Sequence, residues 1–200
     1  MLTVGANAVE VEGRLAGGEF ECPGCGGVLG RWGWARARVL RGGRGAVRVR
    51  PRRARCVGCG VTHVLLPVFA LLRRVDLVEV IGAALAAKAA GAGARPIAAA
   101  WGRPVDTVRG WLRRFGSRAA QVRAFFMRLL VEVGVDPVPP APALSVFADA
   151  VAAVAGALVA AVSRWPGIGE VPPWQLACAA SGGRLLAPGW PQKLINTSSL

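Results

Sequence analysis

Two pairs of cysteines constrain the fold of this chain more than any other feature of its sequence. Cys22 and Cys25 stand in "CPGC", and Cys56 and Cys59 stand in "CVGC" after a gap of 30 residues. A zinc ion takes four thiolate or imidazole ligands in a tetrahedron, and each C-x-x-C pair supplies two of them from one tight turn. The glycines beside the cysteines favour such turns: Gly24, Gly26, Gly58 and Gly60. The spacing is typical of a zinc ribbon, in which the hairpin between the two turns varies in length.

The residues leave two other interpretations of these cysteines open. A C-x-x-C pair is also the pattern of a redox site, and unpaired thiols are often simply buried. We favour zinc because the motif occurs twice. In addition, "MLTVGANAVEVEGRL" lacks the basic start and apolar stretch of a secretory signal, which predicts a cytoplasmic chain with reduced thiols. A module of roughly 45 residues also makes a poor core by itself, and structural zinc contributes an apparent ~10–16 kcal/mol to such modules.

We therefore expect one structural zinc ion, bound by Cys22, Cys25, Cys56 and Cys59. Four sulfurs fill the coordination shell, so the metal would have no open position for catalysis. His63 is an alternative ligand. Because the shell is already filled, a structural role or a contact with nucleic acid is the better expectation for it.

The stretch between the cysteine pairs is strongly basic. Residues 31–55 contain ten arginines and no acidic residue, and they read as two strands around the turn "GGRG". The whole chain has a formal net charge of +14 and a pI near 11.6. This balance indicates a polyanionic partner, nucleic acid before anionic lipid. We expect Arg52, Arg53 and Arg55 to contact phosphates, and a solvated basic face is the alternative.

The rest of the chain reads mostly as helices. The predicted fold class is mostly α with a small N-terminal β zinc ribbon, followed by a helix-turn-helix bundle and an alanine-rich helix. Gly91 is a plausible stop for the first helix of the bundle, and Ser117 is the candidate N-cap of the fourth. The expected order along the chain is a lead-in with weak strand character over 1–20, the ribbon over 21–67, the helical domain over 75–135, a proline-rich linker over 136–145, and the alanine-rich helix with a Pro/Gly/Trp tail over 146–200.

A helix-turn-helix pattern lies in "RPIAAAWGRPVDTVRGWLRRF", residues 95–115. A short helix ends at Gly102, and apolar residues then recur at helical spacing on one face of the next helix: Val108, Trp111, Leu112 and Phe115. The opposite face is basic, and arginines in a major groove can read guanine edges. The DNA contacts expected from this helix are Arg103, Asp106, Thr107, Arg109, Gly110, Arg113 and Arg114, with Gly110 permitting close approach to the duplex. An ordinary three-helix bundle with a solvated basic face is the alternative.

The motifs "CPGC", "RRARCVGCGVTHVLLP" and "RPIAAAWGRPVDTVRGWLRRF", in this order, resemble the zinc-binding and helix-turn-helix front end of insertion-sequence transposases. They are more similar still to a family of short actinobacterial proteins of uncharacterised function that are associated with such elements. The resemblance covers about residues 20–135. It implies DNA binding in a mobile-element setting, with the four cysteines as ligands and the 103–114 helix as the reader.

The chain departs from those transposases after residue 135. They continue into an RNase H-like catalytic domain with three metal-binding acids. The acids of this chain in that region are Asp136 in the proline linker, Asp149 in the alanine-rich helix and Glu170 in a Pro/Gly segment. Because none lies in an expected strand, we expect that the chain is not an enzyme and does not cut DNA by itself.

The segment "LSVFADAVAAVAGALVAAV", residues 144–162, is long and apolar. Its large side chains recur along one seam, at Leu144, Phe147, Val151, Val154, Leu158 and Val162. This pattern is closer to a coiled coil than to a lipid-facing helix, and Asp149 would cost about 2.5–3.5 kcal/mol at the centre of a bilayer. We expect a buried helix or a homodimer through residues 144–162 rather than a membrane span. Cys178 is expected to be a packing residue, and the sequence does not decide whether Trp165, Trp174 and Trp190 dock on the helices or on a partner.

The leading hypothesis from the sequence is a sequence-specific DNA-binding protein that is cytoplasmic and nucleoid-associated. It would act as a mobile-element accessory factor or as a transcriptional regulator. One alternative is the recognition part of a transposase or integrase system whose catalytic subunit acts in trans. A membrane-tethered regulator is the other.

Overall fold

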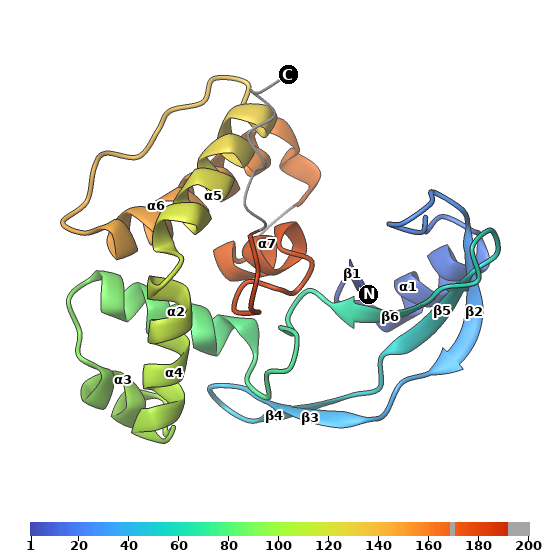
Figure 1. Cartoon of the computed structure of the whole chain (residues 1–200), viewed down its shortest axis with the longest axis horizontal. Helices are drawn as coiled ribbons and strands as arrows, with labels where there is room; N and C mark the ends of the chain where they lie inside the picture. Colours follow the sequence, from blue (N-terminus) through green and yellow to red (C-terminus); the bar gives the residue numbers. More distant parts are fainter. Residues whose placement is uncertain (169–170, 192–200) are drawn as a thin grey trace.

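The computed structural model describes residues 1–168 and 171–191. Figure 1 shows helices α2–α7 gathered at one end of the molecule and a small sheet with α1 at the other. The strands are β1 (Leu2–Val4), β2 (Leu29–Trp34), β3 (Arg38–Arg41), β4 (Ala46–Val49), β5 (Arg52–Cys56) and β6 (Thr62–Pro67). The helices are α1 (Ala8–Ala16), α2 (Val78–Ala89), α3 (Ala94–Ala100), α4 (Val105–Gly116), α5 (Ala119–Val133), α6 (Val146–Arg164) and α7 (Pro173–Ala180), with a 3₁₀ turn, η1 (Pro166–Ile168). The expected helical fold with a small N-terminal sheet is confirmed at this level.

The N-terminal part is a four-stranded sheet in the order β1-β6-β5-β2. Strand β5 pairs antiparallel with both β2 and β6, and β1 joins parallel to β6. One face of the sheet packs against α1 in a cluster that includes Leu15, Leu29, Ala54 and Leu65. The two cysteine loops lie at the end of this sheet, so the sheet fixes their separation.

Helix α1 lies in the lead-in, where the sequence indicated only weak strand character. Strand β1 confirms part of that expectation, but residues 8–16 are helical. Asn7 caps the helix, because its Oδ1 accepts hydrogen bonds from the amides of Val9 and Glu10. Val11 and Leu15, four residues apart, are buried against the sheet. The lead-in thus completes the core of the ribbon.

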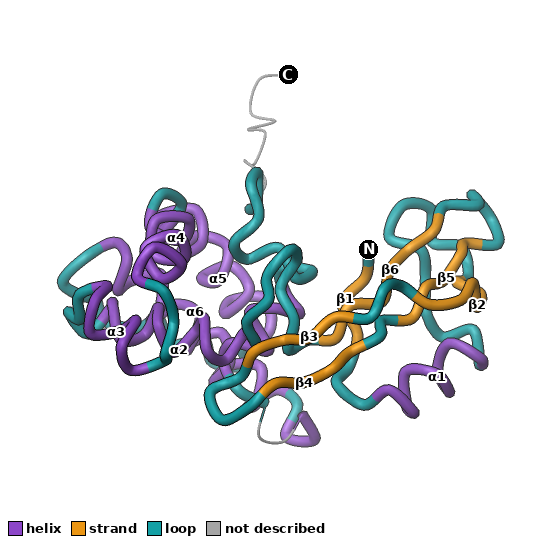
Figure 2. Tube along the Cα trace, turned by 90° about the horizontal axis from the view of Figure 1, so that it is seen from below, coloured by secondary structure: helices purple, strands orange, loops and turns teal. Residues whose placement is uncertain are grey.

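Strands β3 and β4 form a separate two-stranded hairpin around residues 42–45, as the "GGRG" turn predicted. The amide of Ala35 donates to the carbonyl of Pro51 (2.8 Å) where the two arms leave the larger sheet. Figure 2 shows the hairpin bridging the sheet and the helices. Its tip touches the helices, since a Cβ added to Gly43 would lie 2.8 Å from the indole of Trp101. The ribbon is therefore packed directly onto the α3–α4 region.

Helices α2–α7 share one hydrophobic core, which extends from Leu71 to Trp190. The helices expected over 75–91, 95–102, 103–115 and 117–134 are all present. Gly91 follows α2 with a φ of +97°, as its predicted stop role requires. Ser117 is not the N-cap of α5. It continues the last turn of α4, because its amide donates to the carbonyl of Arg113, and Arg118 precedes α5.

Helix α6 packs most extensively against α5, and it also contacts α2 and α7. The predicted seam of large side chains is part of the buried face: Val154 is buried, and Phe147 and Val151 pack against the core, but Leu144 lies outside the helix and is fully exposed. Most of the fully buried positions are alanines: Ala148, Ala150, Ala153, Ala157, Ala160 and Ala161. Small side chains let α5 approach closely, which the larger residues would prevent. By length and composition alone α6 would span a bilayer, with a mean hydropathy of 2.1, and one third of its most apolar window is buried in this fold.

The tail adds a helix that the sequence did not indicate. Trp174 of α7 lies on Gly82 of α2, where a Cβ would come within 2.0 Å of the indole. Trp190 is buried beside Phe125 and Phe126, so these two tryptophans dock on the helices of this chain. Trp165 is half-exposed.

Candidate metal centre and nucleic-acid interface

Each cysteine pair stands on a tight turn built in the same way. The amide of Gly26 donates to the carbonyl of Cys22 (2.8 Å), and the amide of Gly60 donates to the carbonyl of Cys56 (3.1 Å). Both glycines adopt a φ of +72°, a left-handed conformation that favours glycine. The local sequence Cys-x-x-Cys-Gly therefore folds twice into the same loop, and both cysteines of each pair face the same side.

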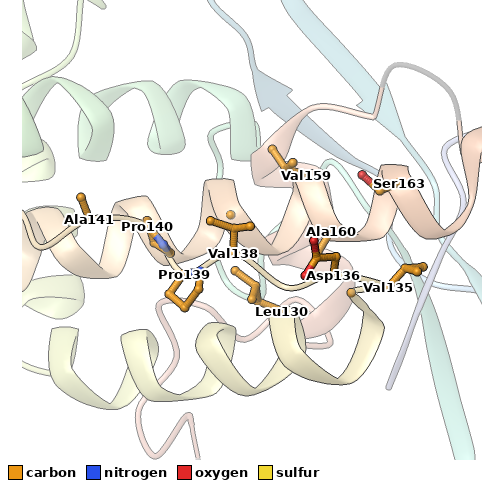
Figure 3. Close-up of a pocket in the computed structure, with 12 residues that line it drawn as sticks. Leu130, Val135, Asp136, Val138, Pro139, Pro140, Ala141, Val159, Ala160 and Ser163 are labelled. Atoms are coloured by element: carbon orange, nitrogen blue, oxygen red, sulfur yellow. The ribbon is translucent and has the colours of Figure 1, made fainter.

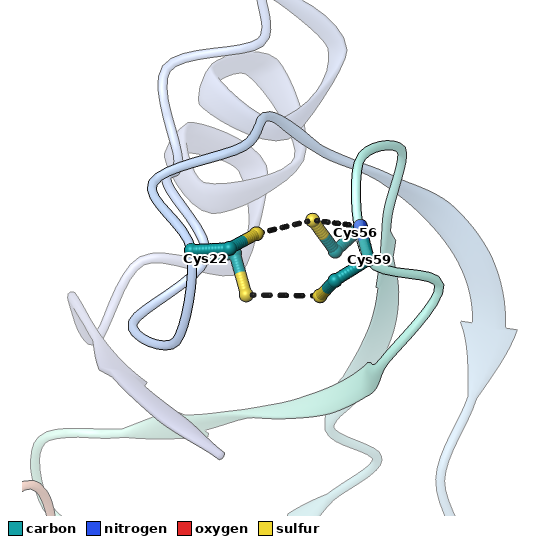
Figure 4. A group of neighbouring side chains, drawn as sticks. Cys22, Cys56 and Cys59 are labelled. Atoms are coloured by element: carbon teal, nitrogen blue, oxygen red, sulfur yellow. Dashed lines mark hydrogen bonds between the residues drawn. The ribbon is translucent and has the colours of Figure 1, made fainter.

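The four cysteines come together as predicted. Figure 4 shows side chains from the two loops converging on one point. All four sulfurs lie within 4.8 Å of one another. Across the loops, the sulfur of Cys22 lies 3.8 Å from that of Cys59, and the sulfur of Cys25 lies 3.4 Å from that of Cys56. A tetrahedral ion with bonds of about 2.3 Å to sulfur spaces its ligands by about 3.8 Å, so the four cysteines form a tetrad suited to a metal ion.

A glycine also makes room for this tetrad. A Cβ added to Gly27 would lie 3.0 Å from the sulfur of Cys56 and 3.4 Å from that of Cys25. No side chain larger than hydrogen fits there without moving a ligand. Gly24 is less restricted, because its Cβ would lie 3.8 Å from the nearest sulfur.

The electrostatics of the tetrad favour binding a cation. The amide of Gly24 lowers the pKa of Cys22, and the amide of Cys59 lowers the pKa of Cys56 to about 6. The amide of Gly27 also lowers the pKa of Cys25, but the neighbouring thiols of Cys56 and Cys59, together with burial, raise it to about 12. Four sulfurs this close cannot all ionise unless a positive charge lies between them, and a divalent ion supplies that charge.

His63 lies behind the tetrad and is buried. Its Nε2 is 3.4 Å from the sulfur of Cys22, and its Nδ1 is 3.0 Å from the N-terminal nitrogen of Met1. The cluster of metal-ligating groups comprises the four cysteines without the histidine. The expected structural role of His63 is thus a hydrogen bond to a ligand, which orients that ligand.

The ten arginines of residues 31–55 fall into two groups. Three pair with acids from elsewhere in the chain: Arg31 and Arg52 with Glu12 of α1, and Arg41 with Asp76. The other seven have no carboxylate partner in the described part of the chain: Arg36, Arg38, Arg44, Arg48, Arg50, Arg53 and Arg55. Arg52 shares the single carboxylate of Glu12 with Arg31 and is only 14% exposed, so it is less available for the predicted phosphate contact than an exposed arginine.

Two exposed tryptophans stand among these arginines. The guanidinium of Arg55 lies 4.7 Å from the ring centre of Trp32, and that of Arg52 lies 4.5 Å from the ring centre of Trp34. Both tryptophans keep about half of their surface in solvent. The signal that could have found them is the pair of tryptophans two residues apart in "RWGW", within an arginine-rich stretch.

Helix α4 has the amphipathic pattern that the sequence predicted. Val108, Trp111 and Phe115 are buried in the core. On the opposite face, Asp106, Arg109 and Arg113 are exposed, and Thr107 is half-buried. Arg109 donates to Asp106 one turn earlier (3.1 Å), which orders both side chains at the surface.

Three of the residues predicted to contact DNA, on or beside α4, are engaged within the fold: Gly110, Arg114 and Arg103. Gly110 is buried, and a Cβ there would lie 2.7 Å from Nη1 of Arg114, which donates to the carbonyl of Gly110. Arg114 therefore covers the glycine rather than projecting into solvent. Arg103 is 11% exposed because it donates to Asp76 (2.6 Å) and to the carbonyl of Gly42 (2.8 Å).

Asp76 links the ribbon hairpin to the helices, beside the backbone hydrogen bonds that Arg41 makes with Val75 and Leu77. Its side chain is 2% exposed and accepts hydrogen bonds from Arg41 of β3 and from Arg103 at the α3–α4 turn. The sequence alone did not indicate this role. A single acid between valine and leucine, in a chain rich in arginine, is a weak signal, and its partners lie 35 and 27 residues away.

The acids of the C-terminal part do not form a comparable group. Asp149 accepts a hydrogen bond from the amide of Ala143 (2.7 Å) and so fixes the start of α6. Asp136 lies in the α5–α6 connection, and Glu170 lies outside the described residues. A cavity of about 480 Å³ lies between this connection, α5 and α6, and its lining is apolar apart from Asp136 and Ser163 (Figure 3). The sulfur of Cys178 is buried and donates to the carbonyl of Ala70, and burial raises the pKa of this thiol to about 12, so it packs as expected.

Comparison with known proteins adds no relative. No protein-family model, curated protein or solved structure matches this chain. The function must therefore be inferred from the tetrad, the arginine-rich hairpin and α4.

Proposed function

We propose that this chain is a sequence-specific DNA-binding protein whose N-terminal ribbon is held by one structural zinc ion. Zinc is the ion that four closely spaced thiolates prefer, and the sulfur spacing supports it. In this proposal the zinc fixes the ribbon, the hairpin contacts phosphates, and α4 lies in the major groove.

One observation carries the proposal. Seven arginines of residues 31–55 have no carboxylate partner among the described residues, in a chain whose net charge is +14. These like charges lie on the β3–β4 hairpin, on its two arms and on β5, and they repel each other unless an anion neutralises them. The phosphates of nucleic acid supply closely spaced negative charges that can neutralise such a group of arginines.

The position of the hairpin supports a role for α4 in contacting the bases of a DNA duplex. Helices α3 and α4 are joined at Gly102, which has a φ of +56°, and they pack against each other as a helix-turn-helix requires. The hairpin tip lies against Trp101 at this turn, so the exposed Arg44 stands next to the start of α4. A duplex lying along α4 would therefore also meet the hairpin. The surviving candidates for base contacts are Asp106, Thr107, Arg109 and Arg113, with Arg44, Arg53 and Arg55 as phosphate contacts.

The mobile-element setting is a proposal that rests on the resemblance to insertion-sequence transposases. We infer an accessory or regulatory role without catalysis, in the cytoplasm at the nucleoid. The second candidate function is the recognition part of a transposase or integrase system whose catalytic subunit is a separate protein, and the resemblance favours it. A gene for an acid-triad integrase next to this one would support that candidate, whereas membrane tethering would require α6 to leave α5 and insert.

The test is selection of bound duplexes from a random pool with the zinc-loaded protein. The wild type should enrich one motif. Arg109→Ala or Arg113→Ala should relax preference at one position and weaken binding there by about 1–3 kcal/mol per lost bidentate contact. Arg128→Ala, an exposed arginine on α5, is the matched control and should enrich the wild-type motif. If Arg109→Ala and Arg113→Ala both enrich the same motif as the wild type, α4 does not make the base contacts.

A further inference from the structure

The ribbon sheet has one covered face and one open face. Paired residues of adjacent antiparallel strands share a face, and successive residues alternate. Leu29, Ala54 and Cys56 are on the face that packs against α1. The residues between them therefore face the other way. This second face includes Gly30, Arg53, Arg55, Thr62 and Val64, none of which is acidic.

Trp32 belongs to this open face. A bulge in the β2–β5 pairing falls between Arg31 and Gly33, so Trp32 is the extra residue and has no partner on β5. The guanidinium of Arg55 lies over its ring, 4.7 Å from the centre. Because half of the Trp32 side chain remains exposed, a flat group can still stack on the indole.

Arg55 is held in place with its charge free. Its Nε donates to the carbonyl of Gly60 in the second cysteine loop (3.1 Å), and its ring contact with Trp32 fixes the other side. Within the described residues, neither of its terminal nitrogens has an acceptor. A hollow of about 330 Å³ lies beside it, lined by Gly30, Arg31, Cys56, Val57 and Gly60 in addition to Arg55 itself. This volume is at the lower end of the range of about 300–1,000 Å³ that small-ligand sites occupy.

The chemistry of this surface matches an unpaired nucleotide. An exposed indole stacks on any base, and an ordered arginine beside it binds a phosphate bidentately. A duplex offers no free base face, because its bases are stacked on each other. Arg53, two residues before Arg55 on the same face, has no carboxylate partner in the described chain and extends the positive charge along the strand.

We propose that the open face of the ribbon binds single-stranded DNA, with a base stacked on Trp32 and the adjacent phosphate held by Arg55. The stacking residue Trp32 lies outside the α4 surface that the proposed function assigns to the duplex, whereas Arg55 is also one of the proposed phosphate contacts of that duplex, so Trp32 is the residue that separates the two proposals. A protein with both surfaces would hold the junction between paired and unpaired DNA.

The experiment measures binding of the zinc-loaded full chain to a fluorescein-labelled oligothymidylate of twelve nucleotides by fluorescence anisotropy. Trp32→Leu should weaken binding about 5- to 150-fold, the range for losing one stacked base. Trp32→Phe keeps an aromatic face and should retain most of the affinity. Trp165→Leu, at a tryptophan of similar exposure on the helical part, is the matched control and should bind as the wild type does. Arg55→Ala should also lower the salt dependence by about 0.7 in slope, the value for one phosphate of a single strand.

Zinc content and circular dichroism of each variant show that the ribbon is intact, which the exposure of Trp32 leads us to expect. Equal affinity of Trp32→Leu and wild type for the strand would overturn the proposal, as would the absence of strand binding by the wild type. A competition experiment distinguishes a DNA strand from a free nucleotide as the ligand. Unlabelled strand should displace the probe. Displacement by free thymidine monophosphate at equal nucleotide concentration would overturn the assignment to a strand. Tighter binding of an RNA strand of matched sequence would overturn the assignment to DNA.

Duplex binding separates this proposal from the function proposed above. Trp32→Leu should leave affinity for a selected duplex unchanged within about twofold, the scatter of distant, additive sites. Arg109→Ala should weaken duplex binding and leave strand binding unchanged. If the protein binds strand but no duplex, the role of α4 fails and the open-face site stands. If it binds duplex but Trp32→Leu has no effect on strand, the open-face site fails alone.

Discussion

Replacing Asp76 by alanine should destabilise the contact between the ribbon hairpin and the helices. The carboxylate is 2% exposed and holds Arg103, which is 11% exposed, and Arg41, which is 43% exposed. Removing one partner of a buried ion pair leaves an uncompensated charge and costs about 3–5 kcal/mol. The pair with Arg41 adds no more than about 1 kcal/mol, because solvent screens a half-exposed guanidinium. The free energy of unfolding should therefore fall by about 3–5 kcal/mol in Asp76→Ala.

The assay is urea denaturation in excess zinc, followed by circular dichroism. Arg41→Ala is the internal control and should cost about 1 kcal/mol or less. The double variant Asp76→Ala/Arg103→Met should be more stable than Asp76→Ala alone, since it removes the buried charge that the single change leaves unpaired. The reasoning is refuted if the free energy of unfolding of Asp76→Ala lies within 1 kcal/mol of the wild-type value, or if the double variant is less stable than Asp76→Ala.

Three further outcomes follow from the tetrad and the tail. Elemental analysis of purified protein should find one zinc per chain, and Cys56→Ser should lose both the zinc and the ribbon fold while Cys178→Ala keeps the zinc; full occupancy in Cys56→Ser would contradict the assignment. Gly27→Ala should weaken zinc binding in a chelator competition because its Cβ would press on two sulfurs, whereas Gly24→Ala should change it far less, and equal effects would show that the close approach at Gly27 is unimportant. Gly82→Ala should destabilise the chain by about 1–3 kcal/mol in urea denaturation, since Trp174 occupies the space of the new methyl group, and an unchanged midpoint would show that α7 does not pack there.

The sequence was most informative where structure is local. The cysteine tetrad could be predicted because a C-x-x-C-G loop is decided by a few adjacent residues, and two such loops need only be brought together by one sheet. The helices α2–α5 and the turn at Gly102 follow from periodicity and glycine positions. The two strands around residues 42–45 follow from the turn residues between them.

What the sequence could not indicate depends on contacts between distant segments. The sequence predicted phosphate and DNA contacts for Arg52 and Arg103. In the fold, Arg52 pairs with Glu12 of α1 and Arg103 pairs with Asp76. The sequence predicted that Gly110 would leave room for DNA, but the side chain of Arg114 covers this glycine. On α6 the large side chains suggested the packing seam, but the distance of closest approach between two helices favours alanine, and this depends on the partner helix.

The central claim is that this chain binds DNA through charges that the fold leaves without partners. Its most direct test is the affinity of the zinc-loaded wild type for a duplex, measured at several salt concentrations from about 50 to 200 mM. Each phosphate contact contributes a slope of about −0.9 to the plot of log affinity against log salt, so engagement of several of the seven arginines predicts a slope between about −2 and −6. Absence of binding at the lowest salt, or a slope near zero, would contradict the account.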